Sequence, residues 1–458
     1  MSVSTSLPVT ADELRGLVAG RVVAPGDPDY DAQRTVVAGH IDRHPALIVR
    51  VANPDDVGAV VRLAAEHGIE LAVRSGGHSG AGHGTVDGGL VIDVRDLDAI
   101  EIDPEARVAW AGSGVTAAAF TEAAGAHGLA VGFGDTGSVG LGGLTLGGGI
   151  GYLVRKLGLT IDALLAADVV TADGQLRRTS AESEPDLFWA IRGGGGNFGV
   201  VTRFQFRLAE VPAAYGGILI LPATPDVLVG YLERSAAAPE ELSSILNVMP
   251  APPMPGVPEA IVGQVVGMAI MCYAGDPEAG ERALVPFRAL AEPIADMLRP
   301  MSYPEIYFPD DPDYRPLAEA RTLFIDRVDR PTAEVIVERL QASDAAMRAV
   351  QIRPLGGAMA RVPNDATAFA HRQSEIMVNV ASFYEGEADR PRRAAWVTDL
   401  ADALRQSDEG AYVNFLVDEG PERVRAAYPG PTWDRLRAIK AGYDPGNLFH
   451  LNQNIPPA

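Results

Sequence analysis

A histidine within a glycine- and serine-rich turn is the first residue in this chain whose type and setting are suited to chemistry. The segment 71–94, LAVRSGGHSGAGHGTVDGGLVIDV, places His78 after two glycines and between two apolar runs that are expected to be strands. Glycine has no Cβ, so the backbone at Gly76 and Gly77 can approach a flat or anionic group closely. The histidine is aimed at a bound ligand or hydrogen-bonded within its own turn, and residue types alone leave both interpretations open.

A second stretch, residues 132–151, contains ten glycines in twenty positions. This density disfavours a good helix or strand, and it offers many backbone N–H groups that can approach a pyrophosphate. A flexible linker is a poor interpretation, because Leu141, Leu144 and Ile150 are apolar and need burial. The run GGGGNFG at 193–199 predicts a second backbone cradle of the same kind.

Two other chemistries are not indicated. His78 and His83 lie five residues apart with no cysteine nearby, and this is not a metal-ligand spacing. The sequence GHSGA at 77–81 misses the nucleophile elbow G-x-S-x-G by one residue, which argues against a hydrolase.

A third pattern resembles a nicotinamide-dinucleotide fingerprint. Residues 107–117, RVAWAGSGVTA, contain G-x-G-x-x-A after an expected strand, and Asp135 follows at a distance suited to binding a ribose. The fingerprint usually opens a fold, whereas here a complete β-α-β unit precedes it. We therefore interpret these glycines as a tight strand-to-helix turn.

The elements that must position these groups begin with that β-α-β unit. Strands are expected at 46–51 and 69–74. The helix between them begins at Pro54 after an Asn53 cap, and Gly68 ends it. This order favours an α/β layer at the start of the chain.

The rest of the chain gives a longer series of expected elements. Strands are expected at 165–171, 200–208, 216–222, 262–272, 350–355, 375–384 and 411–416. Helices are expected at 186–192, 224–236, 276–292, 332–344, 391–406, 421–428 and from Trp433 to about Gly442. Between 209 and 412 the pattern predicts an antiparallel sheet with helices on one face. The proline-rich piece 250–258 is expected to be a surface loop, with a pocket entrance as the alternative.

Composition limits the class of protein. With 458 residues, the chain is long enough for two domains, and its net charge of −22 argues against nucleic acid or an anionic membrane as a partner. The one cysteine, Cys272, allows no internal disulfide. We see no signal-peptide pattern and no apolar run of membrane-spanning length, so we expect a cytoplasmic protein.

Four segments together resemble one family. They are RSGGHS (74–79), GLGGLTLGGGIGYLVRKLGLT (140–160), DLFWAIRGGGGNFGVVT (186–202) and YDPGNLFHLNQNIPP (443–457). In this order they are similar to the berberine-bridge-enzyme-like FAD-linked oxidases of the vanillyl-alcohol-oxidase superfamily. The resemblance implies an α+β, two-domain fold with a bipartite, PCMH-type FAD-binding domain. The domains would be 1–208 for FAD, 209–412 for substrate, and 413–458 as a C-terminal segment returning to the FAD domain.

The resemblance also implies how FAD is held. In the family, the histidine of RSGGHS is bonded to the C8-methyl carbon of the flavin, which makes His78 the covalent ligand. Some members add a cysteine bond from the glycine-rich loop, but Thr136 aligns with that position here. We therefore expect attachment through one histidine. The further residues expected to bind FAD are Arg74, Ser75, Gly76, Gly77, Ser79, Thr136, Gly137, Gly140, Gly142, Gly143, Gly148, Gly149, Gly151, Gly196, Gly199, Val200, Tyr412, Asn414, Asn452 and Asn454.

The catalytic base is less well defined by the resemblance. Family members often use a tyrosine in a Y-x-N-[YF] segment or near the glycine-rich loop. Tyr412 and Tyr152 are the two candidates, and Phe415 occupies the last position of the first pattern. If the family's base aligns with that last position, the chain lacks it, and packing against the flavin is the alternative role of both tyrosines.

The activity implied is that of an FAD-dependent oxidoreductase. A small organic substrate, an alcohol, sugar or amine, would give hydride to flavin N5, and dioxygen would reoxidise the flavin to yield H2O2. A dehydrogenase with another electron acceptor and a flavin-binding protein with little catalysis are the alternatives. The sequence leaves the substrate open among sugars, alkaloids, polyketides and aromatic alcohols, and it leaves the oligomeric state open.

Overall fold

The β-α-β unit expected near the start of the chain is present in the computed structural model, which describes residues 8–311 and 313–458. The four-stranded sheet has the order β1 (Arg21–Val23), β2 (Leu47–Arg50), β4 (Leu90–Asp93) and β3 (Leu71–Arg74). Helix α3 (Pro54–His67) connects β2 to β3, which both pair in parallel with β4. As predicted, the Asn53 side chain caps α3, and Gly68 ends it in the left-handed conformation.

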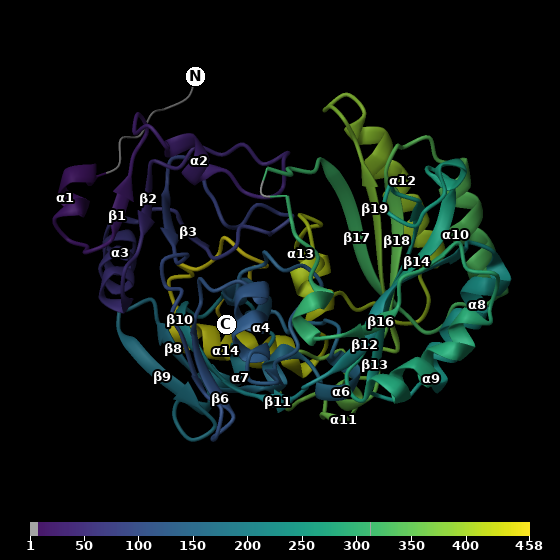
Figure 1. The fold of residues 1–458 in the computed structure, drawn as a ribbon. Helices are drawn as coiled ribbons and strands as arrows, with labels where there is room; N and C mark the ends of the chain where they lie inside the picture. The colour runs from purple at the N-terminus through teal and green to yellow at the C-terminus, as the bar shows by residue number, and fades with distance from the viewer. Residues whose placement is uncertain (1–7, 312) are drawn as a thin grey trace.

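A five-stranded antiparallel sheet lies beside the first one (Figure 1). Its order is β5 (Ile100–Asp103), β6 (Val108–Gly112), β10 (Val200–Arg207), β8 (Leu164–Val170) and β9 (Leu176–Ser180). The accompanying helices are α4 (Ala117–Gly125), α5 (Leu141–Leu146), α6 (Val154–Leu157) and α7 (Pro185–Ala190). Phe120, Phe133 and Phe206 pack edge to face, with ring centroids 5.2–5.7 Å apart, and form the centre of this core.

A third, eight-stranded antiparallel sheet occupies the middle of the chain. Its long strands are β12 (Ala214–Pro222), β14 (Val265–Tyr273), β13 (Leu242–Pro250), β18 (Arg348–Pro354), β19 (Ile376–Phe383) and β17 (Ala318–Ile325), with β15 (Ala295–Asp296) and β16 (Arg299–Met301) at the edge on β12. The helices α8 (Pro225–Ala237), α9 (Pro277–Arg288), α10 (Arg330–Ala342) and α12 (Arg390–Leu404) cover its outer face (Figure 1). The predicted antiparallel sheet with helices on one face is therefore present.

The inner face of that sheet is turned toward the first two sheets, which lie within residues 21–207. The eight-stranded sheet lies within 214–383. The domain borders expected at 208/209 and 412/413 remain predictions.

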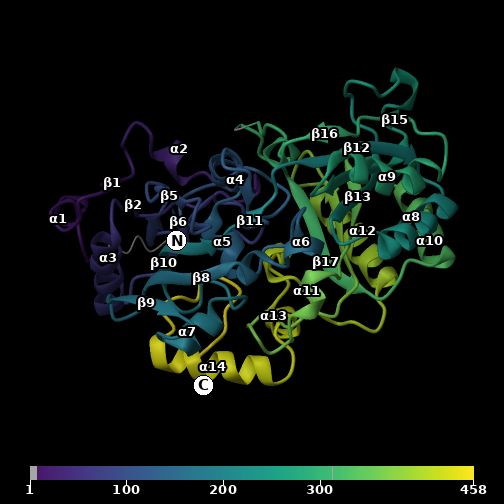
Figure 2. The same cartoon turned by 60° about the horizontal axis from the view of Figure 1, so that its bottom comes forward.

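The C-terminal segment returns to the first part of the chain. Helix α14 (Pro431–Tyr443) packs against α7, and Figure 2 shows it running along that side of the molecule. Before it come the 3₁₀ turn η4 (Val413–Phe415) and helix α13 (Pro421–Ala427). The strand expected at 411–416 is wrong. Residues 413–415 form η4, and the side chains of Tyr412 and Asn414 bond to the glycine-rich loop.

Two other expectations need correction or completion. The glycine-rich stretch was expected to disfavour helix, yet α5 forms inside it because Leu141, Leu144 and Leu146 are all buried. The proline-rich piece forms a loop as expected, and its Met254 and Val257 pack against a cluster that contains Ile218 and Ile220 of β12. No helix in the described part of the chain is both long and apolar enough to cross a membrane.

A buried ion pair fastens the C-terminal segment. Lys440 and Asp444 are both fully buried, with Lys440 Nζ 2.8 Å from Asp444 Oδ2. Lys440 Nζ also donates to the carbonyl oxygens of Asn197 at 2.7 Å and Phe449 at 2.9 Å. Burial lowers the pKa of Lys440, while Asp444 acts in the opposite direction. One ammonium group thus joins α14, the loop at 193–199 and the tail.

We expect Lys440→Met to destabilise the protein by about 3–5 kcal/mol, because it leaves the Asp444 carboxylate buried without its partner. Urea unfolding followed by circular dichroism measures this change. Arg435→Met on the same helix is the control: its pair with Asp186 lies at the surface, and its loss should cost about 1 kcal/mol or less. Equal effects of the two substitutions would contradict the role of the buried pair.

Candidate active site

Two glycine turns from distant parts of the chain meet backbone to backbone. The turn after β3 lies against the loop that leads into α5, and Ser75 Oγ donates to the Ser113 carbonyl at 2.6 Å. A Cβ on Gly76 would overlap the Gly140 nitrogen, and a Cβ on Gly140 would overlap Ser75 Oγ. These two segments of the backbone can approach this closely only because both positions are glycine.

A third glycine turn, the one within 107–117 that resembles a dinucleotide fingerprint, packs beside these two. It connects β6 to α4, and a Cβ on Gly112 or Gly114 would overlap the backbone at Leu97 or Val94. The interpretation of these glycines as a tight strand-to-helix turn agrees with this packing. The structure adds that Ser113, between them, contacts the cavity described next.

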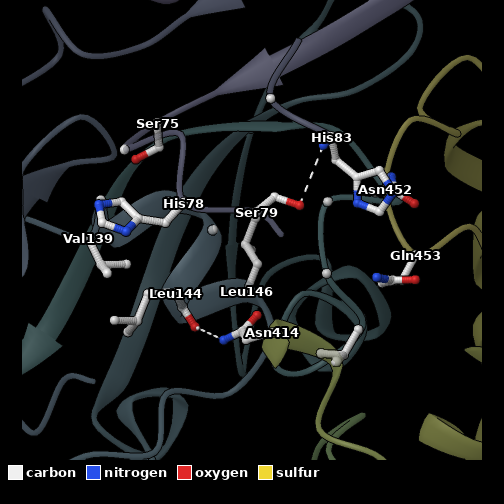
Figure 3. Close-up of a pocket in the computed structure, with 18 of the residues that line it drawn as sticks. Ser75, His78, Ser79, His83, Val139, Leu144, Leu146, Asn414, Asn452 and Gln453 are labelled. Carbon is white, nitrogen blue, oxygen red and sulfur yellow. Dashed lines mark hydrogen bonds between the residues drawn. The ribbon is translucent and has the colours of Figure 1, made fainter. Parts of the chain in front are cut away.

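A cavity of about 450 Å³ lies between these turns, the C-terminal segment and the eight-stranded sheet. Figure 3 shows His78 and Ser79 on the turn after β3, with Asn452 and Gln453 reaching in from the tail. The residues predicted to bind FAD that line it are Arg74, Ser75, Gly76, Gly77, His78, Ser79, Thr136, Gly140, Gly142, Gly143, Gly196, Gly199, Val200, Tyr412, Asn414 and Asn452. The structure therefore brings together most of the residues that the sequence singled out.

Several predicted residues lie outside the cavity lining, namely Gly137, Gly148, Gly149, Gly151, Tyr152 and Asn454. A Cβ on Gly149 would overlap Thr160 Oγ1, and a Cβ on Gly151 would overlap the Phe133 carbonyl oxygen. These glycines are needed for close packing behind the cavity wall. Tyr152 is 2% exposed and packs beside Tyr307 in an apolar cluster, so the structure does not bring its hydroxyl to the cavity.

Other lining residues had not been predicted. They include His83, Ser113, Val139, Asn197, Ala320 and Asn379. Ser113 and Asn197 belong to glycine-rich segments that the sequence had marked, so those segments were the available signal. Ala320 and Asn379 come from β17 and β19, where no local pattern distinguishes a cavity-facing side chain from a packed one.

His78 has a defined partner. Its Nε2 lies 3.2 Å from Ser138 Oγ, and its pKa is lowered by burial, which outweighs the opposing effect of Asp310. His83, on the same turn, has its pKa lowered by burial to about 4. Both imidazoles are therefore neutral at neutral pH, and each retains a nitrogen lone pair.

Tyr412 is held in the wall of the cavity by three donors. Its phenolic oxygen accepts hydrogen bonds from Gly149 N at 3.0 Å, Ile150 N at 3.2 Å and Asn414 Nδ2 at 2.9 Å. Burial raises the pKa of Tyr412, and the three donors oppose that shift. Among the described residues we find no acceptor bonded to the phenol's own proton.

The fit of the cavity to FAD can be judged from atoms that lack partners. Arg74 Nε and Nη1, Ser113 Oγ, Asn379 Oδ1 and Asn452 Oδ1 are buried without a hydrogen-bond partner in the described structure, and all four residues line the cavity. Buried polar atoms normally find partners. A long ligand with phosphates and a polar ring fits this arrangement, and the glycine turns provide the close backbone approach that a pyrophosphate needs.

Comparison with known protein families agrees with this geometry. Residues 45–180 match the family described as FAD binding domain, and residues 411–456 match the family described as berberine and berberine like. The chain is 30% identical over 454 residues to (R)-6-hydroxynicotine oxidase of Paenarthrobacter nicotinovorans, covering 96% of this chain and 97% of the relative. The chain belongs to the berberine-bridge-like FAD-linked oxidoreductases. It is therefore an oxidoreductase of the vanillyl-alcohol-oxidase superfamily.

Further relatives give the same family. Xylooligosaccharide oxidase of Thermothelomyces thermophilus is 31% identical over 450 residues, covering 90% of this chain and 88% of the relative. The crystal structure of 6-hydroxy-D-nicotine oxidase from Arthrobacter nicotinovorans superimposes with a TM-score of 0.86 at 28% identity, covering 96% of this chain and 98% of that chain. The predicted two-domain α+β flavoprotein fold is thus confirmed.

Gly143 and Gly140 offer a matched pair for testing the cradle. A Cβ on Gly143 would meet open space at the cavity, whereas one on Gly140 would overlap protein atoms. We expect Gly143→Ala to keep or raise the stability of the cofactor-free protein, since alanine favours helix by about 1 kcal/mol, while lowering its FAD content. Gly140→Ala should lower both. Absorbance ratios and unfolding midpoints measure the two effects, and full FAD content in Gly143→Ala would contradict the cradle.

Proposed function

We propose that this protein is an oxidase with FAD bonded covalently to His78 alone, acting on a small organic substrate and using dioxygen as electron acceptor. The observation that carries this proposal is a neutral imidazole at a cavity formed by two glycine turns. No cysteine is among the described residues that line that cavity. Thr136 occupies the aligned position, and Cys272 is buried away from the cavity in an apolar cluster with Tyr152. The relatives named as oxidases support dioxygen as the acceptor.

The residues that would hold FAD follow from the lining of the cavity. The glycine turns at 75–79 and 136–143 would bind the pyrophosphate through backbone N–H groups, and His78 would anchor the ring. The chemistry that bound FAD supplies is acceptance of a hydride at N5 and return of two electrons to dioxygen as H2O2. The chain's own contribution is then to orient the substrate and to accept its proton.

The charged side chain of β18 next to the cavity is paired. Arg353 on β18 pairs with Asp135, and it donates to the Ile150 carbonyl at 3.2 Å and to Gln351 Oε1 at 2.6 Å. Asn379 lies directly across from Gln351 in the sheet, it lines the cavity, and its buried Oδ1 has no partner among the described residues. We propose that Asn379 accepts a hydrogen bond from the substrate and that the substrate is neutral, an alcohol or a sugar.

We propose Tyr412 as the group that accepts the substrate's proton. Its three donors stabilise the phenolate, and its own proton is bonded to no described residue, so it is available for exchange with a ligand. Tyr152 lies outside the cavity, which leaves Tyr412 as the one of the two candidate tyrosines that reaches it. The positive charge of Arg353 also favours the phenolate.

The covalent bond is tested without any substrate. After acid precipitation, the yellow colour should stay with the protein pellet, and the intact mass should exceed that of the chain by one FAD. Digestion should give a flavin peptide that contains residues around His78 and none around Thr136. His78→Ala should release its flavin to the supernatant. Colour in the supernatant of the parent protein would contradict the covalent bond.

The proton acceptor is tested by Tyr412→Phe, which keeps the ring and removes the hydroxyl. We expect flavin reduction by substrate to slow by about 10²–10⁴-fold in single-turnover measurements. Because burial raises the pKa of Tyr412, the parent's reduction rate should increase with pH from neutral into the alkaline range, by about tenfold per pH unit below that pKa. The variant should lose this dependence.

Tyr231→Phe is the matched control, since Tyr231 is a buried phenol in the helix-covered core of the large sheet. Its reduction rate should equal that of the parent. A parent-like rate and pH profile in Tyr412→Phe would contradict the role of Tyr412. A flavin that substrate reduces but dioxygen does not reoxidise would identify a dehydrogenase instead.

A further inference from the structure

We propose that Ser138 and Asp310 position His78 for its bond to FAD, so that covalent attachment depends on a contact from the substrate side of the molecule. This inference rests on the proposed covalent flavin. Neither residue was predicted from the sequence to take part in the site. Both are connected to His78 by contacts that do not involve the cofactor.

The first contact fixes the imidazole. His78 Nε2 lies 3.2 Å from Ser138 Oγ. In the tautomer whose Nε2–H is donated to this hydroxyl, the lone pair of the neutral ring resides on Nδ1. The hydroxyl therefore holds the ring in one orientation, and the tautomer in which it accepts the Nε2–H leaves Nδ1 free to act as a nucleophile.

Ser138 is itself held on both sides. Ala118 N donates to the Gly137 carbonyl and Ala117 N donates to the Val139 carbonyl, each at 2.9 Å. These two bonds fix the residues before and after Ser138 to the first turn of α4. A serine between two anchored carbonyls is a rigid support, which is what a positioning group requires.

The second contact crosses to the middle of the chain. Ser138 N donates to Asp310 Oδ2 at 3.0 Å, and Asp310 follows η3 (Tyr303–Ile306) after the edge strands of the large sheet. The same segment is fastened by the Tyr307 hydroxyl, which donates to the Gly134 carbonyl at 3.0 Å. Segment 303–310 thus braces the loop that carries Ser138.

Asp310 also acts through its charge. The carboxylates of Asp310 and Asp135 favour the protonated form of His78, whereas burial and Arg315 disfavour it. Attack by Nδ1 places positive charge on the imidazole as the bond forms. A nearby carboxylate lowers the energy of that charge while burial keeps the starting ring neutral.

The step balances as follows. A bond forms between Nδ1 and the C8-methyl carbon of FAD, and one C–H bond of that methyl group breaks. The two electrons of the C–H bond enter the flavin, and the methyl proton and the imidazole Nε2 proton are released. Dioxygen then takes two electrons and two protons to give H2O2, which restores oxidised flavin on the protein.

The test follows covalent attachment directly, with no substrate. Cofactor-free protein from riboflavin-limited cells is mixed with FAD, and the flavin fluorescence retained after acid denaturation is measured over time. Noncovalent binding is measured separately, by quenching of flavin fluorescence. We expect Ser138→Ala to bind FAD but to form the bond about tenfold more slowly or worse, because the ring loses its fixed orientation. Ser138→Thr, which keeps the hydroxyl, should restore most of the rate.

Asp310→Ala should also slow attachment, while Asp311→Ala, the neighbouring acid in the same segment, should not. A parent rate of attachment in Ser138→Ala or in Asp310→Ala overturns the role of that residue. If Ser138→Ala fails to bind FAD, Asp310→Ala, which retains the hydroxyl, decides the question. Absence of covalent flavin in the parent protein contradicts the proposed function itself, which separates the two failures.

Discussion

The constraint on which this structure depends is the backbone-to-backbone approach of the turn after β3 and the loop before α5. No side chain larger than hydrogen fits at Gly76 or Gly140. The approach brings both turns into the wall of one cavity and places His78 within reach of Ser138. The sheets behind these turns act as a scaffold that holds the two irregular segments next to each other.

Residues 412–444 supply the second half of this arrangement. Tyr412 and Asn414 bond to the backbone of the glycine-rich loop, and Lys440 joins α14 to the loop at 193–199. Each of these contacts satisfies a buried backbone group in a stretch that has few side chains of its own. Because the glycine-rich segments have few side chains, their backbones can pack closely together. Side chains from the C-terminal part of the sequence hold them in place.

The fold and much of the cavity were predictable, because their signals are local. The Asn53 cap, the glycine turns and the helical spacing around 332–344 report directly on backbone conformation. Contacts between distant segments carry no such signal. The stretch at 411–416 has the composition of a strand, yet η4 forms because Tyr412 and Asn414 find partners 262–270 residues earlier in the chain. Strands β13 and β17 were missed, and Asn379 could be assigned to the cavity only from the structure.

The wall of the cavity that residues 412–417 and 449–453 supply also has a consequence for biosynthesis. The sheets built from residues 21–207 can form while the ribosome is still producing the large sheet, because domains generally fold as units in the order of synthesis. The pocket nevertheless lacks a side until residues 412–453 have emerged. Cofactor loading therefore requires that residues 412–453 have been synthesised, and a chain truncated before residue 412 would have two glycine-rich turns without the side chains that stabilise them.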